Sequence, residues 1–114
     1  PGVHADNPET KRRLKNLLQF RKGSQALKQG ETVHFAPQEG VYLMARRYGG
    51  ETVVLLLKKN PGGQLLDTRR FAELGLKGTA YEVLRGKSME WSDDLPLAER
   101  GAFVLAFPPN PDSK

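Results

Sequence analysis

The 114-residue sequence contains no cysteine. This absence excludes a disulfide framework and a cysteine-ligated metal site. No apolar run approaches the roughly 18 residues that suggest a membrane span, and the chain does not start with a signal-peptide pattern. The length is that of one domain with a real hydrophobic core, too short to hold a large enzyme barrel as well.

Residues that commonly carry catalysis are also scarce. Histidine occurs twice, as His4 and His34, and His4 lies in a start that we expect to be disordered. A Ser/His/Asp triad would have to be built on His34, yet none of the four serines lies in a G-x-S-x-G turn. We therefore expect His34 to be an exposed or hydrogen-bonded structural residue. Two isolated histidines also argue against a transition-metal site.

Paired carboxylates and phosphate-binding loops give no stronger signal. Asp93 and Asp94 are adjacent in a predicted bend, where neighbouring side chains diverge, so we interpret them as a solvated turn. The glycines fall in turns and match neither G-x-G-x-x-G nor a Walker loop. The sequence thus predicts no catalytic, cofactor-binding or metal-binding residue.

The net charge of +5 comes from one segment. Between Pro8 and Lys22 there are six basic side chains and one acidic side chain, so the rest of the chain sums to zero. Such a basic helix can bind phosphates in a salt-dependent way or lie on an anionic membrane. In the alternative interpretation, its leucines and Phe20 cover a neighbouring surface while the cations face water.

The chain divides into four parts. Residues 1–7 are expected to be a disordered start. Asn7 is a suitable N-cap, Pro8 suits the first helical position and Gly23 the C-terminal end, which predicts a helix over residues 8–23. Ser24–Gly30 is expected to be a connector, residues 24–108 a β domain, and residues 109–114 a tail.

The β domain is organised around the run from Gly40 to Asn60. Its first half alternates apolar Val41, Leu43 and Ala45 with other residues at a period of two, which is typical of a strand. Gly49-Gly50 suits a tight hairpin turn. The second half, residues 52–57, is apolar on both faces, which predicts an interior strand with cover above and below it.

Shorter patterns predict the other strands, over residues 31–37, 64–67, 79–84, 88–91 and 101–107, with a helical turn or structured loop over residues 68–76. Asp93-Asp94 with Pro96 is expected to be a bend from which Leu95 and Leu97 return to the core. The predicted fold class is mainly β: an antiparallel β-sandwich of about seven or eight strands preceded by one N-terminal helix.

Four aromatic residues offer a possible platform for sugar rings, because aromatic faces pack against the apolar faces of pyranoses: Trp91, Tyr42, Tyr48 and Tyr81. Trp91, however, shares a strand face with Met89, which favours burial in the core.

The order of these segments resembles the C-terminal end of α-amylase-family glycoside hydrolases, closest to bacterial neopullulanases and cyclomaltodextrinases. In that family the last barrel helix carries a pattern like LLxxRKxxxALxxG and leads into a small antiparallel β-sandwich, domain C. Leu84-Arg85-Gly86-Lys87 is similar to the family's LTGK turn, and Gly101 to Phe107 to its closing strand. The helix pattern is filled here by Leu17, Leu18, Arg21, Lys22, Ala26, Leu27 and Gly30.

The resemblance implies a non-catalytic domain. The family hydrolyses α-1,4-glucosidic bonds with residues on the preceding barrel, and none of those motifs occurs here. Pro1 in place of Met agrees with a fragment of a longer enzyme. The chain departs from its relatives at Lys58, where Asn is frequent, and at Trp91, where an aliphatic residue is frequent.

The expected role is to shield and stabilise the barrel, and apolar surface left exposed is expected where the barrel would lie. The resemblance implies the catalytic barrel as the partner, with α-glucan as a second candidate, and neither nucleic acid nor membrane. Two alternatives are a maltooligosaccharide-binding module and nucleic-acid binding through the basic helix. The resemblance allows a periplasmic or a cytoplasmic location.

Overall fold

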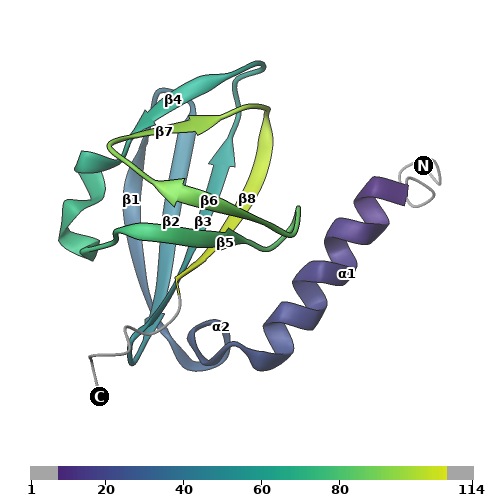
Figure 1. Ribbon diagram of the computed structural model, residues 1–114. Coiled ribbons are helices and arrows are strands. Elements are labelled where there is room, and N and C mark those ends of the chain that lie inside the picture. The colour runs from purple at the N-terminus through teal and green to yellow at the C-terminus, as the bar shows by residue number, and fades with distance from the viewer. Residues whose placement is uncertain (1–7, 108–114) are drawn as a thin grey trace.

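The computed structural model describes residues 8–107 (Figure 1). The expectations for residues 1–7, for Asn7 as a helix cap and for the tail lie outside this range. Two helices come first, α1 (Pro8–Gly23) and α2 (Gln25–Gln29), followed by eight strands and a 3-10 helix, η2 (Thr68–Leu74). The predicted mainly β class with a leading helix is confirmed.

The strands form two antiparallel sheets. The larger has the order β1-β2-β3-β8-β5-β6, with β1 (Glu31–Gln38), β2 (Val41–Tyr48), β3 (Glu51–Lys58), β5 (Gly78–Glu82), β6 (Lys87–Trp91) and β8 (Gly101–Phe107). The smaller pairs β4 (Gln64–Asp67) with β7 (Asp94–Leu97). Figure 1 shows β4, β7, β5 and β6 lying in front of β1, β2 and β3, so the two layers enclose a core.

The central hairpin is formed as the alternation predicts. Tyr48 pairs with Glu51 across the turn, and Val41 pairs with Lys58 at the other end of the ladder. Gly49 adopts a positive φ of 60°, which a residue without Cβ tolerates at no steric cost. The predicted interior position of β3 is confirmed, because β3 lies between β2 and β8.

The main core fills the space between the two layers. The inner faces of β2, β3 and β8 contribute one side of it, while β4, β7 and η2 contribute the other. Phe71 of η2 packs edge-on against Phe35, with ring centroids 4.9 Å apart. The buried core residues of the sheet include Val41, Leu43, Ala45, Val54, Leu56, Phe103, Leu105 and Phe107, and those of the cover include Leu66, Phe71, Leu74, Leu95 and Leu97.

Two local expectations were wrong. Ser24–Gly30 is not a plain connector but contains the short helix α2, because the Ser24 hydroxyl caps the Leu27 N–H and the Glu51 carboxylate accepts from Ala26 N–H. Asp94–Leu97 is not a bend but strand β7. Pro96 is tolerated there because the two-stranded sheet has no further strand to pair with.

Candidate functional site

The outer face of the larger sheet, turned away from the main core, is only partly covered by the two helices. Leu17 and Phe20 of α1 pack against a second cluster that includes Val83 and Val104, and Ala26 of α2 packs in the same cluster with Val53. Figure 1 shows α1 lying beside the sheet and α2 at the base of β2 and β3. The interpretation that the helix covers a neighbouring surface is therefore confirmed for Leu17 and Phe20 and wrong for Leu14 and Leu18, which stay exposed.

An apolar region beside the helix is only partly covered; we call it the open face. It consists of Met44, Leu55 and Leu57 on the sheet and Leu14 and Leu18 on α1. Leu57 and Leu18 are each 48% exposed and Leu14 is 55% exposed. A cleft of about 310 Å³ lies between the two parts, and its lining includes Leu18, Met44 and Leu55. Contiguous exposed apolar surface of this kind marks an interaction site more often than it marks a free surface.

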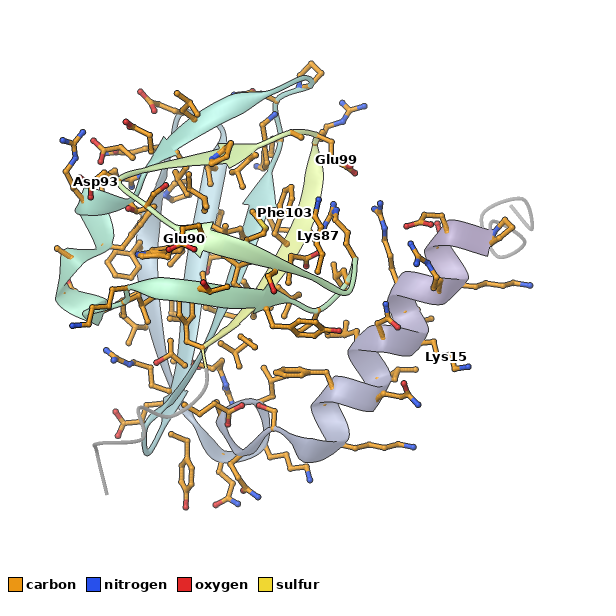
Figure 2. The ribbon with its side chains drawn as sticks, in the orientation of Figure 1. Lys15, Lys87, Glu90, Asp93, Glu99 and Phe103 are labelled. Atoms are coloured by element: carbon orange, nitrogen blue, oxygen red, sulfur yellow. The ribbon has the colours of Figure 1, made fainter. Side chains whose placement is uncertain are left out.

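The charges beside the open face have one sign. Arg21 and Arg46 line the same cleft. Lys11, Lys15 and Lys22 surround Leu14 and Leu18 on the other side of the helix, and Figure 2 shows Lys15 pointing away from the sheet. A partner surface that carries carboxylates would therefore be favoured.

Polar contacts hold α1 in its place on the domain. Asn16 Nδ2 donates to the Leu84 carbonyl at 3.1 Å, and Arg13 lies 3.6 Å from the Glu99 carboxylate. Glu99 also accepts from Arg85 at 3.2 Å, and Arg85 is bonded in turn to the buried carboxylate of Glu82. Figure 2 shows Glu99 on the side of the sheet that faces α1. The orientation of the open face thus depends on a chain of charged groups.

This chain of charges makes the stability of the folded chain depend on pH. The hydrogen bond from Arg85, aided by the charge of Arg13, holds the pKa of Glu99 below its ordinary value of 4.5. The stability from Glu99 is therefore fully present above its unfolded pKa and is lost as the pH falls through its folded pKa. Because Glu99 is half exposed, we expect a contribution of only about 0.2–1 kcal/mol.

We expect wild-type chain to lose more stability than Glu99→Gln between about pH 6 and pH 3, measured by urea unfolding. The protection factors of the α1 amides, which correct exchange rates for the intrinsic effect of pH, should fall at acid pH in wild type and should already be lowered at neutral pH in the variant. Equal losses of stability in the two chains would contradict the assigned role of Glu99.

The residues singled out by sequence do not assemble into a catalytic centre within residues 8–107. His34 is exposed, and its Nδ1 lies 2.6 Å from the Tyr42 hydroxyl, as expected for a structural histidine. Trp91 packs edge-on against Phe107, with ring centroids 5.4 Å apart, and borders the main core. In this part of the chain no three His, Asp or Glu side chains gather as they would around a metal ion.

Further sequence candidates are also dispersed. Asp94 begins β7, whereas Asp93 accepts from Thr68 N–H through its backbone carbonyl. Two of the basic side chains of α1, Arg12 and Arg13, pair with Glu9. Neither described helix is long and apolar enough to span a bilayer. Sequence reasoning did not find the contact between Arg13 and Glu99, because no local pattern links residues so far apart.

Comparison with known proteins identifies the class of domain. Residues 32–106 match the family model described as the cyclo-malto-dextrinase C-terminal domain. The chain belongs to this family of C-terminal domains of α-amylase-family glycoside hydrolases.

Solved structures share the fold. An α-amylase from Anoxybacillus superposes with a TM-score of 0.69 at 22% identity, over 91% of this chain and 23% of that chain. A Geobacillus thermoleovorans α-amylase crystallised with acarbose gives 0.63 at 20% identity, over 88% of this chain and 23% of its own. A maltogenic α-amylase from Thermotoga neapolitana gives 0.64 at 17% identity, over 82% and 24%. The chain therefore spans about a quarter of the length of these enzymes.

Proposed function

We propose that this chain is the non-catalytic C-terminal domain of an α-glucan-hydrolysing enzyme of the neopullulanase, cyclomaltodextrinase or α-amylase type. Its role is to cover and stabilise the catalytic barrel. The observation that carries the proposal is the open face. This domain belongs to a family found at the C-terminal end of larger enzymes, and it exposes Leu14, Leu18 and Leu57 to solvent. Burying such side chains against the barrel would stabilise the assembly by about 1.5–3 kcal/mol each.

The helix α1 is proposed to be shared between the two parts of the enzyme. Its Leu17 and Phe20 belong to the packing of this domain, while Leu14 and Leu18 are free to pack against the barrel. In this view residues 8–23 are the last helix of the barrel and residues 24–108 form the C-terminal domain. The division explains why α1 presents apolar side chains in two directions.

The non-catalytic role predicts that the purified chain releases no reducing sugar from cyclodextrin, pullulan or starch. The physical reason is that a glycosidase needs one carboxyl group with a raised pKa to act as the general acid. The directly paired carboxylates Asp67 and Asp94 do not supply it, because the hydrogen bond from the Arg69 side chain lowers the pKa of Asp67. The assay is a reducing-end measurement at high protein concentration, with a commercial α-amylase as the positive control. Turnover that co-purifies with the chain would contradict the proposal.

The covering role predicts association in trans. A separately produced catalytic part of the parent enzyme should bind the chain in one-to-one stoichiometry, measured by isothermal titration calorimetry. Because apolar surface is buried, the heat-capacity change of binding should be negative. The covering role would be contradicted if no heat of binding were measured at two temperatures and the chain did not raise the midpoint of thermal inactivation of the catalytic part.

A further inference from the structure

A second cleft lies on the other side of α1 from the open face. It measures about 280 Å³ and is lined by Asn16, Gln19, Phe20, Tyr81 and Val83, so α1 forms one wall and the outer face of β5 with the turn after it forms the other. The volume is at the lower end of the ~300–1,000 Å³ of ligand pockets, which suits a short ligand. No residue of this cleft belongs to the open face.

The cleft combines an accessible aromatic ring with unused hydrogen-bonding groups. Tyr81 is 47% exposed, and its hydroxyl makes no hydrogen bond to another described residue. The side-chain amide of Gln19 is equally free among residues 8–107. Asn16 donates one N–H to the Leu84 carbonyl, which fixes its amide and leaves its oxygen available as an acceptor.

Gly86 lies where the two walls of the cleft come together. A Cβ at this position would lie 3.6 Å from the Tyr81 hydroxyl and 3.9 Å from Asn16 Nδ2. The phenol of Tyr81 and the amide of Asn16 therefore approach the same backbone position from the two walls. This arrangement places the apolar face of an aromatic ring next to side-chain hydrogen-bond donors and acceptors.

Most of the cleft is turned away from the open face; only Gln19 also lines the hollow beside Leu14 and Leu18. Asn16 and Leu18 are two residues apart, which is about 200° around an α-helix. Leu18 lines the cleft of the open face, whereas Asn16 lines the second cleft. A domain docked through Leu14, Leu18 and Leu57 would still present Tyr81 to solvent.

We propose that this cleft binds a glucosyl unit of an α-1,4-linked glucan, with the ring of Tyr81 stacked on the apolar face of the sugar. Gln19 and Asn16 bind the hydroxyls at the edge of the sugar ring. The choice of an α-1,4-glucan rests on the proposed function, whereas the choice of a sugar rests on the aromatic and amide chemistry of the cleft. Tyr81 is one of the four aromatic residues that the sequence offers as a sugar platform, whereas Trp91 packs on Phe107 instead.

The test is a titration of the 114-residue chain with maltotriose, followed by chemical-shift changes of backbone amides. We expect saturable binding with a dissociation constant on the order of millimolar and shifts centred on residues 16–20 and 81–86. Tyr81→Ala should weaken binding at least about tenfold, Tyr81→Phe should retain most of it, and Gln19→Ala should weaken it by a smaller factor.

A matched control is available in Tyr48, which is 46% exposed in the turn of the central hairpin. Tyr48→Ala should bind maltotriose as wild type does, and cellotriose should bind more weakly than maltotriose. No saturable binding, shifts elsewhere on the chain, or equal weakening by Tyr48→Ala and Tyr81→Ala would overturn the sugar site. Because the open face takes no part in this titration, a negative result would leave the proposed covering role intact.

Discussion

Replacing Glu82 with alanine is expected to destabilise the chain by about 3–5 kcal/mol, the cost of breaking a buried ion pair at one partner. Glu82 has no exposed surface. Its two carboxylate oxygens accept from the backbone N–H groups of Leu84, Arg85 and Val104, at 3.1, 2.8 and 2.9 Å, and from the Arg85 guanidinium at 3.1 Å. The variant removes the shared acceptor of these four donors and leaves the buried Val104 N–H without it.

This loss is a large fraction of the roughly 5–15 kcal/mol that stabilises a typical domain, so the midpoint of urea unfolding should fall markedly. Glu90 on the adjacent strand β6 is the matched control, because it is exposed and bonded only to the Thr79 hydroxyl. Figure 2 labels Glu90 on the β6 ribbon. Glu90→Ala should change stability by no more than about 0.5 kcal/mol.

A conservative variant refines the test. Glu82→Gln keeps the shape and one acceptor oxygen but turns an N–H₂ group toward donors, so we expect a loss smaller than that of Glu82→Ala. Equal midpoints for Glu82→Ala and Glu90→Ala would contradict the view that the buried carboxylate ties β5, the following turn and β8 together.

Much of the fold is readable from sequence because its strands carry local signals. Val41, Leu43 and Ala45 alternate at a period of two, and all three are buried on the inner face of β2. The run over residues 52–57 is apolar on both faces because β3 is covered by the main core on one face and partly by the helices on the other. Turn glycines such as Gly49 mark where these strands end.

Other features were missed because they depend on distant partners. Strand β7 carries Pro96 and begins at Asp94, directly after Asp93. These residues locally favour a bend, but pairing with β4 makes the segment a strand. Lys58 carries an ammonium group that sequence reasoning would place in water. The structure buries it, and its Nζ donates to the carbonyls of Asn60 and Gly62, so it fixes the turn after β3.

The open face could not be predicted from the sequence either, because it too depends on how distant segments pack. The sequence predicts an interior strand over residues 52–57, yet Leu57 at its end is 48% exposed while Val53 at its start is fully buried. The difference arises because α2 covers the start of β3 and neither helix covers its end. The different exposure of Leu57 and Val53 therefore follows from where the helices lie, which the strand pattern does not encode.

The central claim, that the open face covers the catalytic barrel, is tested most directly by a pair of leucine substitutions in the parent enzyme. Leu57 lies on the open face and is 48% exposed; Leu65 lies on the opposite two-stranded sheet and is 62% exposed. In the 114-residue chain alone, Leu57→Asp and Leu65→Asp should each lower stability by about 1 kcal/mol or less, because both side chains are largely exposed and aspartate is disfavoured in a strand at both positions.

In the parent enzyme the two variants should diverge. Leu57→Asp would place a charge in an apolar contact and cost roughly 2–4 kcal/mol, which corresponds to a fall of about 2–4 °C in the midpoint of thermal inactivation of an enzyme about four times as long as this chain. Leu65→Asp should leave that midpoint unchanged. Equal midpoints for the two variants, or a larger fall for Leu65→Asp, would show that the open face does not contact the barrel.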